Sequence, residues 1–253
     1  SGLVLGLYYG GTGLGIVASA LGVPMALKTS GADWPAAWLL LAAIAGAASF
    51  VTLVGTRGLS SSPSHAPARE PAPWRPFAFA LAGYAGFGLG YIGYMTFVIT
   101  LLREQGLPAG WITAFYTLLG CGVVASSWLW SGLLQRHRDG KPMAVLNGLL
   151  AFATVLPVLS GSLAAVMASG LLFGAVFLSV VASTTALVRH QLPPAAWPSG
   201  IAAFTIVFAA GQIVGPSLVG LIADGPGGLL RGFAVSAALL ALCLLYTSPS
   251  PRD

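Results

Sequence analysis

The sequence predicts an all-α integral membrane protein, and its composition together with its long apolar stretches is what predicts it. Of the 253 residues, 57% are hydrophobic and only 7% are charged, and the mean hydropathy is +0.88. An ordinary soluble domain carries about 25% charged residues, so this chain has too few charges to build a water-facing surface. Disorder requires low hydrophobicity and many charges. The composition therefore excludes both a soluble globular domain and a disordered chain.

Stretches of about 20 mainly apolar residues are long enough to cross a bilayer as helices. The chain contains eight such stretches, of which the last is short: 2–27, 34–56, 77–102, 111–134, 143–160, 163–188, 199–223 and 229–242. The 34 glycines and 17 prolines fit a membrane bundle, because glycine lets membrane helices approach closely and proline kinks are tolerated there.

Basic residues are divided unequally between the two sets of loops. The loops 58–76, 135–142 and 189–198, with Arg57 at the edge of the first, carry seven Lys and Arg, whereas the opposite loops carry three. The positive-inside rule then predicts that the first set is cytoplasmic. The Ser, Pro and Ala composition of 58–76 is typical of a flexible linker. We therefore expect two helices in 1–57, a cytoplasmic linker over 58–76, and six helices in 77–242.

Neither end of the sequence resembles a natural end. Residue 1 is Ser and leads straight into an apolar stretch. The segment 243–253 reads CLLYTSPSPRD and resembles the conceptual translation of a sequencing adapter, so we expect the genuine sequence to stop near Leu242. Two helices before a long linker and six after it are what a transporter of two six-helix bundles leaves when its first four helices are missing. An intact eight-helix protein is the alternative.

A glycine-proline motif in the seventh apolar stretch carries a resemblance to a known family. Residues 210–224 read AGQIVGPSLVGLIAD, which places Gly211, Gly215, Pro216 and Gly220 in register. This is similar to the GxxxGPxxGG-type motif of the major facilitator superfamily (MFS). Gly211 and Gly215 give a smooth face for helix packing, and Pro216 removes a backbone hydrogen bond so that the helix can bend. We expect the four residues to serve packing and hinge motion.

Three further segments extend the resemblance: GGTGLG at 10–15, WPAAW at 34–38 and GYAGFGLGYIGYMTF at 83–97. Together they look like the YbfB/YjiJ-type branch of the MFS. The resemblance implies an MFS-type helical bundle, in which the chain supplies the last two helices of the N-terminal bundle and a nearly complete six-helix C-terminal bundle. It also implies a packing or hinge role for Gly11, Gly15 and Pro24.

An aromatic strip on the stretch 77–102 is the first candidate for a substrate-binding surface. At about 100° per residue, Tyr84, Phe87, Tyr91 and Tyr94 fall within about 80° of one another on a helix, beside a packing strip of glycines. Phenolic hydroxyls in hydrocarbon need partners, so the strip faces either a water-filled cavity or a hydrogen-bonded core, and both remain open. The resemblance makes this the seventh helix, which lines the central cavity in the MFS.

Thr205 and Gln212 are the uncharged polar candidates for substrate binding in the seventh stretch. A packing role for Gln212 stays open, and so does a bond from Thr205 to its own helix. Every Asp and Glu lies in a loop or at a helix end, and no Lys or Arg lies mid-span. This argues against an intramembrane enzyme and places any proton-coupling carboxylate in the missing helices. The histidines lie in loops, so we expect no metal and no cofactor.

The sequence therefore predicts an MFS-type secondary transporter that moves a small organic solute across the bacterial cytoplasmic (inner) membrane by alternating access. The expected partners are the solute and the lipid bilayer, and the full-length protein is expected to be monomeric. Nucleic acid is not an expected partner, because the excess of 11 basic over 6 acidic residues relates to membrane topology. A non-transporting membrane sensor or scaffold is the alternative.

Overall fold

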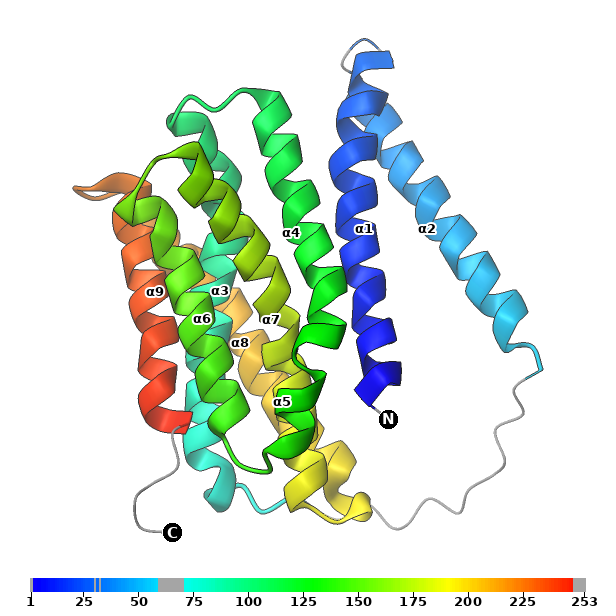
Figure 1. The fold of residues 1–253 in the computed structure, drawn as a ribbon, viewed down its shortest axis with the longest axis vertical. Coiled ribbons are helices and arrows are strands. Elements are labelled where there is room, and N and C mark those ends of the chain that lie inside the picture. Colours follow the sequence, from blue (N-terminus) through cyan, green and yellow to red (C-terminus); the bar gives the residue numbers. More distant parts are fainter. Residues whose placement is uncertain (1, 30, 32, 59–70, 248–253) are drawn as a thin grey trace.

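The computed structural model describes residues 2–29, 31, 33–58 and 71–247, and all the regular secondary structure in these residues is helical (Figure 1). The long helices in this part of the chain are α1 (Gly2–Thr29), α2 (Trp34–Thr56), α3 (Ala78–Glu104), α4 (Ala109–Leu129), α6 (Lys141–Leu159), α7 (Leu163–Gln191), α8 (Trp197–Ala223) and α9 (Gly228–Thr247). The short elements are η1 (Arg75–Phe77), α5 (Ser131–Arg136) and η2 (Pro194–Ala196).

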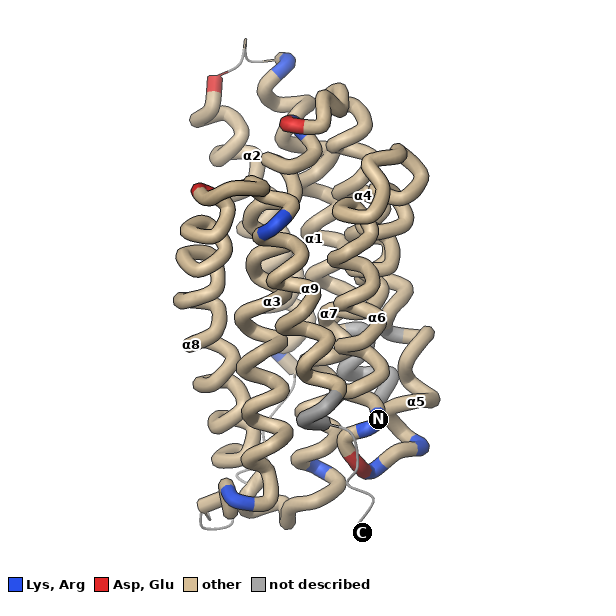
Figure 2. Tube along the Cα trace, turned by 90° about the vertical axis from the view of Figure 1, so that its left-hand side faces the viewer, with Lys and Arg blue, Asp and Glu red and all other residues tan. Residues whose placement is uncertain are grey.

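The helices have the length and the charge distribution of membrane spans. Among the described residues, seven segments are long and apolar enough to cross a bilayer, and α9 adds a shorter apolar stretch, Gly228–Leu244. Charged residues gather towards the two ends of the helices, with long uncharged stretches between them (Figure 2). A bilayer requires this arrangement, because a charged side chain at its centre is costly. The protein is therefore an integral membrane protein, as the composition predicts.

Helices α3 to α9 form one bundle, beside which α1 and α2 stand (Figure 1). Within the bundle, α3 packs against α8 and α9, while α7 packs against α4 and α6, and α6 also contacts α9. Helix α1 lies along α4, and α2 contacts mainly α1. Most of α2 is exposed and apolar, which suits a surface that faces lipid.

Proline and glycine mark the helix boundaries. Helices α2, α6 and α8 each have a proline in their first turn, where the missing N–H group has no helical partner to lose. The α3–α4 connection turns at Gly106, whose φ is 76°, and the α8–α9 connection turns at Gly227, whose φ is 94°. Residues with a side chain rarely adopt these values, so glycine allows both helical hairpins to close tightly.

The structure differs from the predicted spans at one break. The predicted stretch 111–134 is divided, because α4 ends at Leu129 and α5 begins at Ser131. Trp130 lies at the break, and its indole nitrogen donates a hydrogen bond of 2.7 Å to the carbonyl oxygen of Ala175 on α7. A contact with another helix thus accompanies the break, and an apolar pattern carries no sign of such a contact.

Two predicted segments lie partly outside the described residues. Of the predicted linker 58–76, residues 59–70 are not described. Of the predicted adapter-derived tail 243–253, residues 248–253 are not described, whereas α9 continues to Thr247. Cys243 is buried, and its Sγ donates to the carbonyl oxygen of Gly83 on α3 at 2.9 Å.

Candidate functional site

Close glycine contacts hold α3 between α8 and α9. A Cβ atom added at Gly88 would lie 2.9 Å from the carbonyl oxygen of Phe208 on α8. On the opposite side, a Cβ at Gly86 would lie 2.9 Å from the Sγ of Cys243, and one at Gly90 would lie 2.8 Å from the carbonyl oxygen of Ser236. Real Cβ atoms do not approach so closely. The glycines therefore allow the three helices to pack with their backbones almost in contact.

The glycine-proline motif supplies the α8 side of this packing. A Cβ at Gly211 would lie 3.0 Å from the Cα of Gly88, and one at Gly215 would lie 2.9 Å from the carbonyl oxygen of Leu89. A Cβ at Gly220 would make only ordinary contact, 3.6 Å from the ring of Phe97. The other predicted hinge residue of the motif, Pro216, lies inside α8. Gly211 and Gly215 therefore lie where α8 packs closely against the backbone of α3.

The predicted packing residues of α1 are not the residues that make its closest contact with another helix. Gly11 and Gly15 have no neighbour within 4 Å of an added Cβ. Gly13, between them, lies against α4, where an added Cβ would come within 2.7 Å of the carbonyl oxygen of Gly120. Pro24 lines a groove beside α4. The crossing of α1 and α4 is thus made by a glycine pair that the sequence argument did not identify.

This packing brings aromatic rings of three helices together in what we call the aromatic wall, made of Tyr84, Phe87 and Tyr91 on α3, Phe177 on α7 and Phe208 on α8. The ring of Phe208 stacks on the rings of Tyr84, Phe87 and Tyr91 at centroid distances of 5.3, 5.5 and 5.4 Å. Phe177 stacks on Tyr91 at 6.2 Å. Stacked rings at such distances attract one another beyond simple burial, so the wall is a cohesive unit.

The wall carries polar groups but no charge. The Nε2 of Gln212 donates a hydrogen bond to the Tyr91 hydroxyl, which joins α8 to α3. Thr184 on α7 donates to the carbonyl oxygen of Val181, on its own helix, at 2.8 Å. Tyr91 is 7% exposed, whereas Phe208 and Gln212 are half-buried. The Gln212 side of the wall is therefore its more exposed part.

Two predicted substrate-binding residues lie away from the wall. Tyr94 is fully buried, with its hydroxyl 2.7 Å from the Oγ of Ser169 on α7 and its ring stacked 4.0 Å from that of Phe173. Ser169 Oγ in turn donates to the carbonyl oxygen of Ala153 at 2.7 Å, so the Tyr94 hydroxyl is the donor to Ser169. Thr205 is exposed and donates to the carbonyl oxygen of Ile201, on its own helix, at 2.9 Å.

The structure adds aromatic residues that sequence reasoning missed. Phe177 and Phe208 belong to the wall, and Phe204 packs edge-on against Tyr84 at 5.6 Å. A signal for two of them exists in the sequence, because Phe204, Phe208 and Gln212 are spaced four residues apart and so share one face of a helix. Phe177 carries no comparable signal, since its role depends on how α7 packs against α3.

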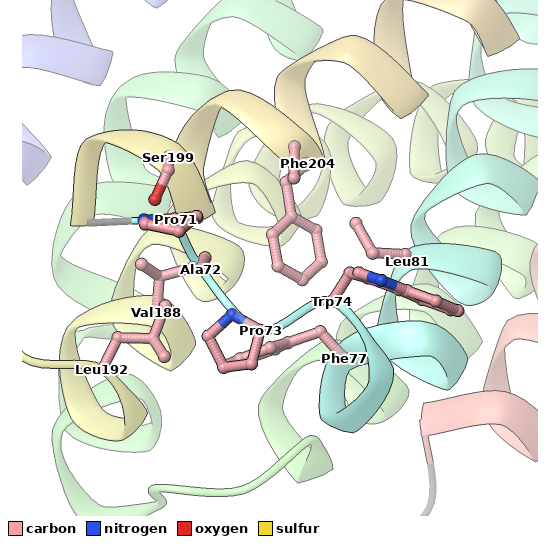
Figure 3. A pocket seen from close by; sticks show the side chains of 12 residues that line it. Pro71, Ala72, Pro73, Trp74, Phe77, Leu81, Val188, Leu192, Ser199 and Phe204 are labelled. Carbon is pink, nitrogen blue, oxygen red and sulfur yellow. The ribbon is translucent and has the colours of Figure 1, made fainter. Parts of the chain in front are cut away.

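An apolar pocket of about 220 Å³ lies at the end of the wall nearest the linker. Figure 3 shows Pro73 and Phe77 beneath Phe204, with Val188 of α7 and Leu192, the residue that follows α7, at one side. Phe204 packs edge-on against Phe77 at 6.1 Å as well as against Tyr84. The pocket and the wall therefore meet at Phe204, and the last residues of the linker, Pro71 to Trp74, close this end.

The charged side chains of the described residues lie at helix ends, away from the wall. An ion pair of 3.4 Å joins Lys141, the first residue of α6, to Asp139 in the loop before it. In the part of the chain that the structure describes, no group of three His, Cys, Asp or Glu side chains is placed to hold a metal ion. The arrangement suits recognition of an uncharged, planar or apolar molecule by stacking and by a few hydrogen bonds.

Comparison with known proteins identifies the family. No curated protein and no solved structure matches the chain. A family model described as "Uncharacterised MFS-type transporter YbfB" matches residues 1–248, which is nearly the whole chain and includes part of the segment that resembles an adapter. The match agrees with the resemblance carried by the glycine-proline motif and with the all-helical membrane bundle. The chain therefore belongs to the YbfB-type family of transporters within the major facilitator superfamily.

Proposed function

We propose that this protein is a secondary transporter that moves a small organic solute with an apolar or aromatic part, and that the aromatic wall forms part of its binding surface. The observation that carries the proposal is the half-buried edge of the wall, where Phe208 and Gln212 lie beside Tyr91. Binding sites for small molecules are mostly apolar with a few well-placed polar groups, and aromatic rings favour stacked partners.

Gln212 has free acceptors to offer such a solute. Its Nε2 is used by Tyr91, whereas its side-chain oxygen accepts no hydrogen bond from the residues that the structure describes. Its backbone carbonyl lacks the usual helical donor, because the residue four positions later is Pro216, which has no N–H. A solute with a hydroxyl or amide donor could therefore bind here without displacing a helical hydrogen bond.

The same proline supports alternating access as the mechanism. Transporters of this kind rock groups of helices about a central site, and a proline within a helix lets it bend. Bending at Pro216 would move the linker-side half of α8, which carries Gln212 and Phe208, relative to the rest of α8. Coupling to an ion requires an ionisable group on the solute path, which we place outside the described spans. We place the protein in the bacterial cytoplasmic membrane, with the linker side inward.

Binding to the solubilised chain tests the solute class. Benzamide and cyclohexanecarboxamide have the same polar group, but only benzamide has a planar ring that can stack. We expect benzamide to raise the thermal unfolding temperature more than its saturated match, because a ligand that binds the folded state stabilises it by mass action. Gln212→Leu should weaken the binding by about 2- to 12-fold, the range for a typical hydrogen bond of about 0.5–1.5 kcal/mol.

Gln135→Leu is the matched control, since Gln135 is exposed on α5, and it should leave binding unchanged. Equal binding of the two carboxamides, or an equal effect of the two substitutions, would contradict the aromatic wall as the site. Uptake of labelled benzamide by bacteria that express the gene then tests transport itself. A membrane sensor or scaffold would bind the solute without moving it.

A further inference from the structure

A second cavity lies between α1 and the α3–α4 hairpin, at the end of the molecule opposite the linker. Its volume is about 540 Å³, which is within the range of sites that take small organic ligands. Its lining comes from residues 19–27 of α1, from Ile99 and Arg103 of α3, and from one face of α4 between Ala109 and Tyr116. We call this cavity the outer groove. None of its lining residues belongs to the aromatic wall.

The outer groove is apolar along its length and has one charged lining residue, Arg103. Arg103 is exposed in the last turn of α3, and its guanidinium forms no ion pair with any residue that the structure describes. Glu104 follows it in the chain but does not line the groove. The charge of Arg103 is therefore available to a ligand in the groove.

Three helix ends lie at this end of the groove, next to the lining residues Leu27, Arg103 and Ala109. Helix α4 begins at Ala109, which lines the groove. The first N–H groups of a helix lack helical acceptors and together carry a partial positive charge. Helices α1 and α3 end on the same side, at Thr29 and Glu104, and the last carbonyl groups of a helix carry the opposite partial charge. The helix ends therefore offset one another and Arg103 supplies the positive charge, whereas Val23, Leu27 and Ile112 give the groove its apolar lining.

From this arrangement we propose that the outer groove binds a small organic anion, with its carboxylate at Arg103 and its apolar body between α1 and α4. Arginine is suited to this role, because its planar guanidinium can donate two parallel hydrogen bonds to a carboxylate. The Thr113 and Tyr116 hydroxyls on the α4 side can receive a polar substituent on the body of the ligand. The residues of the outer groove are separate from those of the proposed transport site. The two proposals can therefore fail independently of each other.

Binding of octanoate to the full 253-residue chain in phosphatidylcholine nanodiscs tests the inference. Isothermal titration calorimetry, with empty nanodiscs as the blank, should show saturable binding of octanoate. Arg103→Gln should weaken it about tenfold or more, the lower end of what a hydrogen bond to a charged group contributes, and Arg103→Lys should retain part of the affinity. Octanol, which has the same chain without the charge, should bind wild type and Arg103→Gln equally.

The control variant is Arg231→Gln, because Arg231 is exposed at the same end of the bundle but does not line the groove. It should bind octanoate as wild type does, whereas Val23→Trp should fill the groove and abolish binding of both ligands. An equal loss in the two arginine variants would mean general surface attraction and would overturn the site. Unchanged octanoate binding in Val23→Trp would place the anion elsewhere. Loss of octanoate binding in phosphatidylglycerol nanodiscs would assign the groove to a lipid headgroup and overturn the proposal of a free organic anion.

Discussion

Replacing Gly211 with alanine should destabilise the protein, because the added methyl group has no space at the crossing of α8 and α3. The new Cβ would lie 3.0 Å from both the Cα and the carbonyl carbon of Gly88, and 3.0 Å from the amide nitrogen of Leu89. All three atoms belong to the backbone, so no side chain can rotate away to relieve the contact. The two helices must separate instead, which also loosens the stacking of Phe208 on the rings of α3.

The size of the effect follows from two opposing contributions. Overpacking of a tight interior costs about 1–3 kcal/mol, whereas alanine in place of glycine within a helix gains roughly 0.5–1 kcal/mol from backbone entropy. Gly220→Ala in the same helix isolates the second contribution, because its new Cβ would lie 3.6 Å from Phe97, an ordinary contact. The free energies of unfolding of the two variants should therefore differ by about 1–3 kcal/mol, with Gly211→Ala the less stable.

The measurement is unfolding of each variant in mixed micelles with increasing dodecyl sulfate, followed by circular dichroism. Gly215→Ala should unfold at nearly the same detergent fraction as Gly211→Ala, since its Cβ would lie 2.9 Å from the carbonyl oxygen of Leu89. If the alanine variants at 211 and 220 unfold at the same detergent fraction, the helices do not approach as closely as the structure describes. The argument that the glycine-proline motif forms a packing seam would then fail.

Three further predictions test topology, the core and the wall. Reporter fusions should report a cytoplasmic location at Gly140 and an external one at Pro108. A cytoplasmic signal at Pro108 would contradict the orientation predicted from the distribution of basic residues. Tyr94→Phe should lower the free energy of unfolding by about 0.5–1.5 kcal/mol and leave solute binding unchanged. Weaker solute binding in this variant would mean that Tyr94 belongs to the binding site. After Cys121→Ser, Phe208→Cys should react with water-soluble thiol reagents while Tyr94→Cys stays protected, because the reaction needs water and thiolate. Equal protection at both positions would show that water does not reach the wall.

Much of the fold could be predicted from the sequence, because the bilayer constrains it so strongly. A helix satisfies its own backbone hydrogen bonds, so each apolar stretch of sufficient length had one suitable structure, and the helical spans were predicted with boundaries close to those observed. The division between α4 and α5 was not predictable in this way. It coincides with the bond from Trp130 to Ala175 on α7, and nothing near Trp130 in the sequence indicates that partner.

In the candidate site, too, the local sequence determines some features and the packing of distant helices determines others. The sequence alone determined which residues of α3 share a face, because helical periodicity is a local property, and it singled out the glycines of α8 by their spacing. Only the tertiary structure decided that Tyr91 faces Gln212 and Phe208, whereas Tyr94 turns into the core towards Ser169. Tyr91 and Tyr94 are less than one helical turn apart, so the small angle between them directs one ring to α8 and the other to α7. Periodicity fixes that angle, but which helix lies in each direction depends on packing between distant parts of the chain.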